Sequence, residues 1–238
     1  VKAADLNKMD GAAKKGDNEV LLEKTKLDDF DSVDISMTDM NLQVVPSDDR
    51  SCYISYQASD QTKDPMRYQV KDRKLTIREN DNTGKFYYHV DIGFLSGLLG
   101  GGPVTTDENV VTLYIPEEQE WKTADIKTDM SNIMLNGCKI ENGTVQSNSG
   151  DIYFKNCDFD NLKIDSDMGD IHFVGTEDVM GAWNIQIDTD MGDIDVDDAL
   201  GGKVKEDEDD CDLSYTQKGK GGNLVIQTDS GDVSLDCR

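Results

Sequence analysis

Apolar and polar residues alternate along most of the chain, in short runs that are separated by Asp, Asn, Gly and Pro. In FDSVDISMTDMNLQVVPSDD (30–49), for example, Val33, Ile35 and Met37 alternate with polar neighbours. A period of two is typical of half-buried β-strands, and the short polar connections between the runs predict hairpins. Further strands are expected in SCYISYQAS, MRYQVKDRKLTIREN, KFYYHVDIGF and VVTLYIP. The pattern therefore predicts an all-β chain.

From residue 126 onward a ten-residue segment recurs. The copies are IKTDMSNIML, VQSNSGDIYF, IDSDMGDIHF, IDTDMGDIDV and IQTDSGDVSL, which begin at 126, 145, 164, 187 and 226, so the offsets are 19, 19, 23 and 39. A period near 19 suits one coil of a parallel β-solenoid, here a single-stranded β-helix that the crossover rule predicts to be right-handed. Because 39 is close to twice 19, residues 201–222 are expected to contain an irregular coil without a Gly-Asp corner. The four extra residues before Asn184 are expected to bulge.

The Gly-Asp pairs predict the corners of the coils. Glycine supplies the positive φ that such a corner commonly needs, and aspartate can bond its own backbone in the turn. The predicted corner residues are Gly150, Asp151, Gly169, Asp170, Gly192, Asp193, Gly231 and Asp232.

Two of the five cysteines, Cys138 and Cys157, are separated by the same interval as the first copies of the repeat, and no CxxC motif occurs. The spacing predicts a buried ladder of small residues inside the solenoid. A disulfide between coils and metal ligation remain as alternatives.

Charge narrows the choice of partners. The 238 residues include 49 acidic and 24 basic ones, a net charge of -25, which repels nucleic acid and anionic membranes and favours cationic partners, including basic peptides. No segment approaches the length of a membrane span, and the chain begins with Val1, so any leader or anchor is expected upstream. The expected organisation is a linker or stalk (1–26), an N-terminal β part with hairpins that leads into or caps the solenoid (27–116), and the solenoid repeats (117–238).

The ordered set of motifs, from FDSVDISMTDMNLQVVPSDD through YQVKDRKLTIREN and VVTLYIPEEQEWKTADIKTDMSNIML to the SGDI and MGDI repeats, resembles a bacterial adhesin family of unknown function with a toastrack-type β-solenoid. The resemblance covers the chain from about residue 30 to its end. It implies a non-catalytic role on the outer face of a bacterial envelope, with links to envelope stress in some relatives. It implies no catalytic residues and no cofactor.

The aspartates of the repeats are candidates for calcium ligands, namely Asp167, Asp170, Asp190 and Asp193. An EF-hand needs glycine at its sixth and glutamate at its twelfth position, and these positions counted from Asp165 are Asp170 and Thr176, so that motif is excluded. Solvated acidic corners are the alternative to a metal site.

Two further hypotheses concern function. Clustered carboxylates in a β-helix could form a glycan-active enzyme, for which Tyr153, His172 and Trp183 are the available sugar platforms. The stretch GFLSGLLGGGP (93–103) either caps the open end of the core or exposes an apolar patch for a partner. Its apolar residues are Phe94, Leu95, Leu98 and Leu99.

Overall fold

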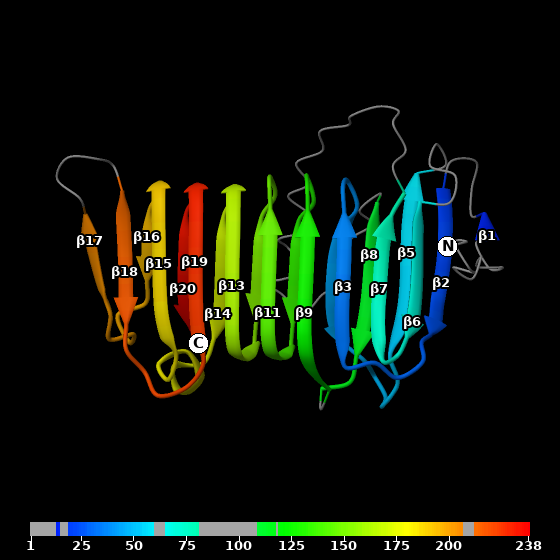
Figure 1. The fold of residues 1–238 in the computed structure, drawn as a ribbon, viewed down its shortest axis with the longest axis horizontal. Helices are drawn as coiled ribbons and strands as arrows, with labels where there is room; N and C mark the ends of the chain where they lie inside the picture. The colour runs from blue at the N-terminus through cyan, green and yellow to red at the C-terminus, as the bar shows by residue number, and fades with distance from the viewer. Residues whose placement is uncertain (1–12, 15–18, 60–64, 81–108, 118, 207–211) are drawn as a thin grey trace.

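The computed structural model describes residues 13–14, 19–59, 65–80, 109–117, 119–206 and 212–238. The strands form two ten-stranded sheets that lie face to face, with the apolar core between them (Figure 1). Within these residues the only helix is α2 (Glu177–Met180), and no helix there is long and apolar enough to cross a membrane. The predicted all-β class is confirmed.

The two sheets combine a parallel centre with antiparallel ends. In sheet A the strands lie in the order β1 (Ala13–Lys14), β2 (Glu19–Lys26), β5 (Tyr53–Ser59), β8 (Val110–Ile115), β4 (Asn41–Pro46), β10 (Ile133–Asn136), β12 (Ile152–Lys155), β14 (Ile171–Gly175), β20 (Val233–Cys237) and β16 (Ile194–Val196). In sheet B the order is β17 (Lys203–Glu206), β18 (Leu213–Gln217), β15 (Asn184–Met191), β19 (Asn223–Ser230), β13 (Asp158–Met168), β11 (Lys139–Ser147), β9 (Glu120–Thr128), β3 (Ser32–Met37), β7 (Lys74–Glu79) and β6 (Met66–Lys71). Antiparallel pairing is confined to the ends of these series.

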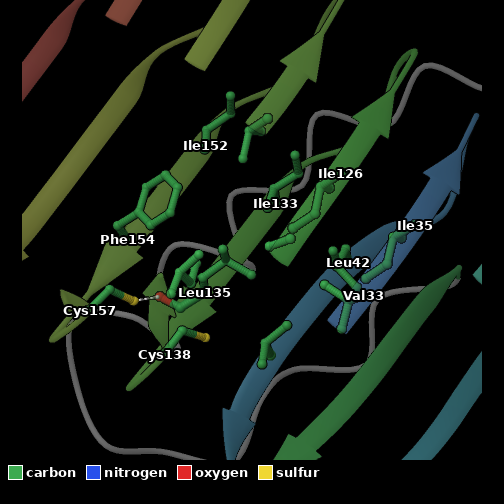
Figure 2. Packing of buried hydrophobic residues seen from close by; sticks show 14 of the residues in the cluster. Val33, Ile35, Leu42, Ile126, Ile133, Leu135, Cys138, Ile152, Phe154 and Cys157 are labelled. Carbon is green, nitrogen blue, oxygen red and sulfur yellow. Dashed lines mark hydrogen bonds between the residues drawn. The ribbon is translucent and has the colours of Figure 1, made fainter. Parts of the chain in front are cut away.

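Each repeat forms one coil, which crosses sheet B, turns at the predicted corner and returns along sheet A. Neighbouring coils keep the register of the sequence repeat, so that Ile126 pairs with Val145 and then Ile164 in sheet B, and Ile133 pairs with Ile152 in sheet A. All of these side chains are buried, and Figure 2 shows Ile126, Ile133 and Ile152 pointing into the core. Strands β3 and β4 pair in parallel with β9 and β10, so the stack of coils begins upstream of the repeats.

The order of the coils in space differs from their order in the sequence. Strands β19 and β20, the last of the chain, lie between the β13–β14 coil and the β15–β16 coil, so the C-terminus lies within the stack (Figure 1). The prediction of an irregular coil for residues 201–222 is wrong. The strands in this region, β17 and β18, form an antiparallel pair at the edge of sheet B. The offset of 39 residues between the last two copies of the repeat instead separates residues that pair on neighbouring rungs, such as Asn184 and Asn223.

The four extra residues before β15 provide the length that this arrangement needs. From β14 to β15 the chain passes two rungs, because the rung between them is filled by β19 and β20. Helix α2 and the turn after it occupy the expected place of the insertion. Met180 and Trp183 are buried there, so this segment covers the core and does not simply bulge from a coil.

The corner glycines have tight surroundings. Gly150, Gly169 and Gly231 have φ values of +133°, +117° and +149°, as predicted, whereas Gly192 is not among the residues with positive φ. A Cβ on Gly192 would nevertheless lie 2.1 Å from the carbonyl oxygen of Gly231. Glycine is therefore required at these corners because adjacent coils approach each other closely as well as for its conformational freedom.

Candidate functional site

A ladder of aspartate and asparagine side chains runs along the corners. The backbone N–H of Asp151 donates to Oδ1 of Asn132 at 2.8 Å, that of Asp170 to Asp151 at 3.0 Å, that of Asp232 to Asp170 at 2.9 Å, and that of Asp193 to Asp232 at 2.8 Å. The bonds therefore join neighbouring coils, which corrects the expected bond from each aspartate to its own turn. Such charge-assisted bonds to backbone N–H groups tie each coil to the next.

The four calcium candidates belong to two different sets. Asp170 and Asp193 are members of the corner ladder, whereas Asp167 and Asp190 lie on the outer face of sheet B with Asp229 between them. Among the residues that the structure describes, no group of three or more His, Cys, Asp or Glu side chains is arranged to hold a metal ion. The calcium site stays a prediction, for which the structure brings only part of the quartet together.

An acidic groove lies on the outer face of sheet B, where β13, β19 and β15 are adjacent. It has a volume of about 270 Å³ and contains five carboxylates, those of Asp165, Asp167, Asp188, Asp190 and Asp229. They form two rows across the three strands, and Gln227 fills the one remaining position. Neighbouring rungs in such a sheet are about 4.8 Å apart. The groove is therefore a regular lattice of carboxylates.

Only one of the two rows has side-chain partners recorded among the described residues. Lys163 Nζ lies 3.1 Å from Asp165, and Gln186 Nε2 donates to Asp188 at 2.9 Å. The row of Asp167, Asp229 and Asp190 shows no such contact. Two carboxylates about 5 Å apart repel each other by about 1 kcal/mol in water. This row therefore concentrates negative charge that a cationic ligand would relieve.

A second, larger hollow lies beside the acidic groove on the same face. Its volume is about 660 Å³, and it extends over β9, β11, β13 and β19. An amide ladder runs through this region, in which Asn161 donates to Asn142 at 3.1 Å, Asn223 to Asn161 at 2.9 Å, and Asn184 to Asn223 at 3.3 Å. Threonines, lysines, Asp125, Gln146 and small or apolar residues complete the lining. The hollow therefore offers neutral donors and acceptors in a regular row.

A comparison with protein families shows to which family the chain belongs. The model of the family Toastrack DUF4097 matches residues 30–238. The chain belongs to this Toastrack family. No curated protein matches the chain.

Three solved structures resemble this Toastrack chain to different degrees. A protein from Clostridium sporogenes ATCC 15579, whose name proposes a role in cell adhesion, is 12% identical with a TM-score of 0.56, and the match covers 92% of this chain and 99% of that one. A proposed adhesin from Bacteroides fragilis NCTC 9343 is 12% identical with a TM-score of 0.38, covering 92% and 98%. A protein from Parabacteroides distasonis ATCC 8503, named for proposed lipid binding, has 10% identity and a TM-score of 0.27, covering 92% and 97%. Only the first supports a shared fold.

The three candidate sugar platforms of this Toastrack chain do not line its acidic groove. Tyr153 and His172 stack at 4.7 Å between ring centroids on sheet A, and His172 Nδ1 lies 2.6 Å from Ser234 Oγ. Burial and the nearby carboxylate of Asp151 raise the pKa of Tyr153. Trp183 is 3% exposed and packs against the core. Trp183 Nε1 donates to Asp158 of β13 at 3.3 Å, but none of the three sugar platforms of the enzyme hypothesis lines the acidic groove.

Cys138 and Cys157 form the predicted ladder inside the core (Figure 2). Their side chains are 0% and 5% exposed, both are free thiols, and the Cys157 thiol donates to the carbonyl oxygen of Leu135 at 3.3 Å. Burial raises the pKa of Cys138, and its contact with Cys157 adds to this effect. Cys138 is therefore held as a buried, protonated thiol.

One set of candidate residues lies outside the part of the chain that the structure describes, and one residue with several contacts was missed by the sequence analysis. Phe94, Leu95, Leu98 and Leu99 lie outside the described residues. Glu79 was missed, although its Oε2 accepts hydrogen bonds from three successive backbone N–H groups (38–40) at 2.6, 2.9 and 3.0 Å. Burial raises the pKa of this carboxyl, while the three bonds act in the opposite direction. No sequence signal marks it, because its partners are 39 to 41 residues away.

Proposed function

We propose that this chain is a non-catalytic binding module of the bacterial cell surface, with an adhesin-type or envelope-stress role. It would lie outside the cell and be attached to the cell envelope. Its ligand would be a protein, a glycan or a cationic peptide held on the outer face of sheet B. Membership of the Toastrack family and the shared fold with a protein named for proposed cell adhesion support this proposal.

The observation that carries the proposal is the adjacency of two unlike hollows on one sheet face. The amide-lined hollow and the acidic groove share β13 and β19, so one ligand could contact both. Rows of polar side chains at a fixed spacing suit an extended or repetitive ligand, because each rung repeats the same contact.

The alternative is a glycan-active enzyme that uses the clustered carboxylates. Neighbouring rungs place two carboxylates at about 5 Å, a separation that retaining glycosidases use. The groove lacks aromatic lining, however, since its walls are aspartate, serine, threonine and glutamine. This arrangement favours binding over cleavage.

A binding panel tests the proposal directly. Immobilised protein would be exposed to neutral oligosaccharides, acidic oligosaccharides and basic peptides, and compared with the variant Thr144→Trp, which fills the larger hollow on β11. Ser55→Trp, on the outer face of sheet A, is the control. The proposal is supported if Thr144→Trp, or the triple variant Asp167→Asn, Asp190→Asn, Asp229→Asn, reduces binding and Ser55→Trp leaves it unchanged. Release of reducing ends from a polysaccharide, lost in Asp167→Asn, would establish the enzyme instead.

A further inference from the structure

Cys138 and Cys157 occupy the same position in two neighbouring coils. Cys138 directly precedes β11 and Cys157 directly precedes β13, and the first residues of these strands, Lys139 and Asp158, pair with each other. The backbone N–H of Asp158 also donates to the carbonyl oxygen of Cys138 at 2.9 Å. Neighbouring rungs are about 4.8 Å apart, and the Cα atoms of a disulfide are usually about 4.4 to 6.8 Å apart. The backbone therefore holds the two cysteines at a separation that a disulfide spans.

The two sulfur atoms also gather at one turn. The Cys157 thiol donates to the carbonyl oxygen of Leu135, which belongs to the preceding coil, at 3.3 Å (Figure 2). The Cys138 sulfur lies 3.9 Å from the carbonyl oxygen of Asn136, the next residue of the same turn. The Cys157 side chain thus reaches across the boundary between the coils, and the two thiols contact each other.

The other cysteines that the structure describes have different surroundings. One coil earlier, the position that corresponds to Cys138 is Gln119, whose Oε1 accepts the thiol of Cys52 at 2.8 Å. Cys237 lies on β20 in sheet A and is partly exposed. Within the described part of the chain, Cys138 and Cys157 are therefore the cysteines that stack in register on adjacent coils.

The surroundings of the pair favour a covalent bond over a bound metal ion. Two thiols supply only part of a structural zinc site, which needs further ligands. Nowhere in the described ranges do three or more His, Cys, Asp or Glu side chains gather in an arrangement for a metal. Outside the cell, in contrast, disulfides form and persist.

We propose that Cys138 and Cys157 form a disulfide that joins two adjacent coils when the chain folds in an oxidising compartment. This inference rests on the proposed function, which puts the chain outside the cell. The bond forms during folding, because the two side chains are only 0% and 5% exposed afterwards.

The oxidant is an external disulfide, such as oxidised glutathione or the disulfide of a thiol–disulfide oxidase. One cysteine thiolate attacks it, releases the first external thiol and forms a mixed disulfide. The second cysteine attacks this mixed disulfide and releases the second external thiol. The bond between the two Sγ atoms forms, the external S–S bond breaks, and the two cysteine protons pass to the two released thiols. The cysteines lose two electrons, which the external disulfide gains.

The bond would close a loop of one full repeat, which contains β11 and β12. A cross-link over a loop of this size restricts the unfolded chain, and it should raise Tm by roughly 5 to 10 °C. Because the sulfur atoms are buried, a thiol reductant should break the bond slowly in the folded protein and rapidly in urea.

Refolding from urea in a buffer of reduced and oxidised glutathione tests the proposal. The refolded protein is unfolded in the presence of an alkylating reagent, digested and mapped by mass spectrometry. A peptide linked through Cys138 and Cys157 should appear, and Cys52 should be alkylated. The protein refolded in this buffer should have a Tm roughly 5 to 10 °C above that of protein refolded with a reductant.

Two variants separate the bond from the packing of the thiols. Cys157→Ala should abolish the difference in Tm between oxidising and reducing refolding. Cys52→Ala, which changes another buried cysteine, should keep this difference. Because each substitution also changes core packing, the readout is the difference between the two redox conditions for one and the same variant.

Three outcomes would overturn the inference. These are full alkylation of Cys138 and Cys157 after refolding in the glutathione buffer, links from them to other cysteines alone, and a difference in Tm that persists in Cys157→Ala. None of these results touches the proposed function, because the binding panel requires no disulfide. If the linked peptide forms but no probe binds in the panel, the proposed function fails and the cross-link stands as a property of the fold.

Discussion

The corner ladder permits a sharp test at Asp170, which lies in the middle of the stack. Its Oδ1 accepts the backbone N–H of Asp232 at 2.9 Å, and carboxylates of the same ladder lie on the rungs on both sides. Two substitutions separate these effects. Asp170→Asn removes the charge but keeps an acceptor oxygen, as Asn132 does at the start of the ladder. Asp170→Ala removes both.

The magnitudes follow from the two contacts. Asn and Ala relieve the same repulsion, so their difference isolates one hydrogen bond to the backbone N–H of the exposed Asp232, about 0.5 to 1.5 kcal/mol. The repulsion from two neighbouring carboxylates at about 5 Å is about 1 kcal/mol in total once salt screening is included. Asp170→Asn loses the charge assistance of the bond, but it also loses this repulsion. Its free energy of unfolding should therefore lie within about 0.5 kcal/mol of that of the unmodified protein.

Urea unfolding followed by circular dichroism provides the measurement, at low and high salt and at equal m-value. The expected order is the unmodified protein close to Asp170→Asn, with Asp170→Ala less stable. Higher salt should stabilise the unmodified protein relative to Asn. Equal stability of Asn and Ala would refute the ladder as a source of stability. A loss of more than about 1 kcal/mol in Asn would show that the charge itself is favourable, as for a bound cation.

The remaining predictions use the same unfolding assay. Gly169→Ala should cost about 3 kcal/mol, because φ is +117° and the new Cβ would lie 2.4 Å from a carbonyl oxygen, whereas Gly201→Ala, with nothing within 4 Å, should be close to neutral. Glu79→Ala should cost about 3 kcal/mol through the loss of three backbone bonds, and Glu79→Gln clearly less; equal losses would contradict the role of the acceptor. Hydrogen bonds from a lysine and an arginine lower the pKa of Asp31 to about 2, so its contribution is present above pH 4 and lost as pH falls toward 2. Asp31→Asn should therefore show a weaker loss over that range, and an unchanged profile would contradict the assignment. Calcium, checked with a chelator, should raise Tm by less than about 2 °C, since the corner carboxylates already accept backbone N–H groups; a larger rise would revive the metal site.

The coil itself could be predicted from the sequence because its determinants are local. The register of one repeat per coil follows from strands of alternating pattern and a corner that needs glycine, and both can be read from Ile126, Val145 and Ile164 and from Gly150 and its equivalents. The inward position of the cysteine ladder follows from the same register.

The order of the coils could not be predicted, because every coil presents the same pattern to its neighbours. The β19 strand pairs equally well in register with β13 and with β15, although the two lie at different distances from it along the chain, and nothing local excludes sequential stacking. The one available signal was the insertion before Asn184, which gives the chain length to pass a rung. Without that order, Asp229 could not be placed between Asp167 and Asp190, and the acidic groove was not recognisable.

Aspartates occur in two settings in this chain, which differ in what they contribute to the stability of the fold. At the corners, each carboxylate from Asp151 to Asp232 binds a backbone N–H of the next coil, so its charge serves the fold. The outer row of Asp167, Asp229 and Asp190 has no such bond recorded, and its members repel one another across strands that become adjacent only through the insertion of β19. Neutral side chains would serve the fold as well there, as the amide ladder on the same face demonstrates. Stability alone therefore does not account for this row, which forms where three strands that are distant in sequence meet.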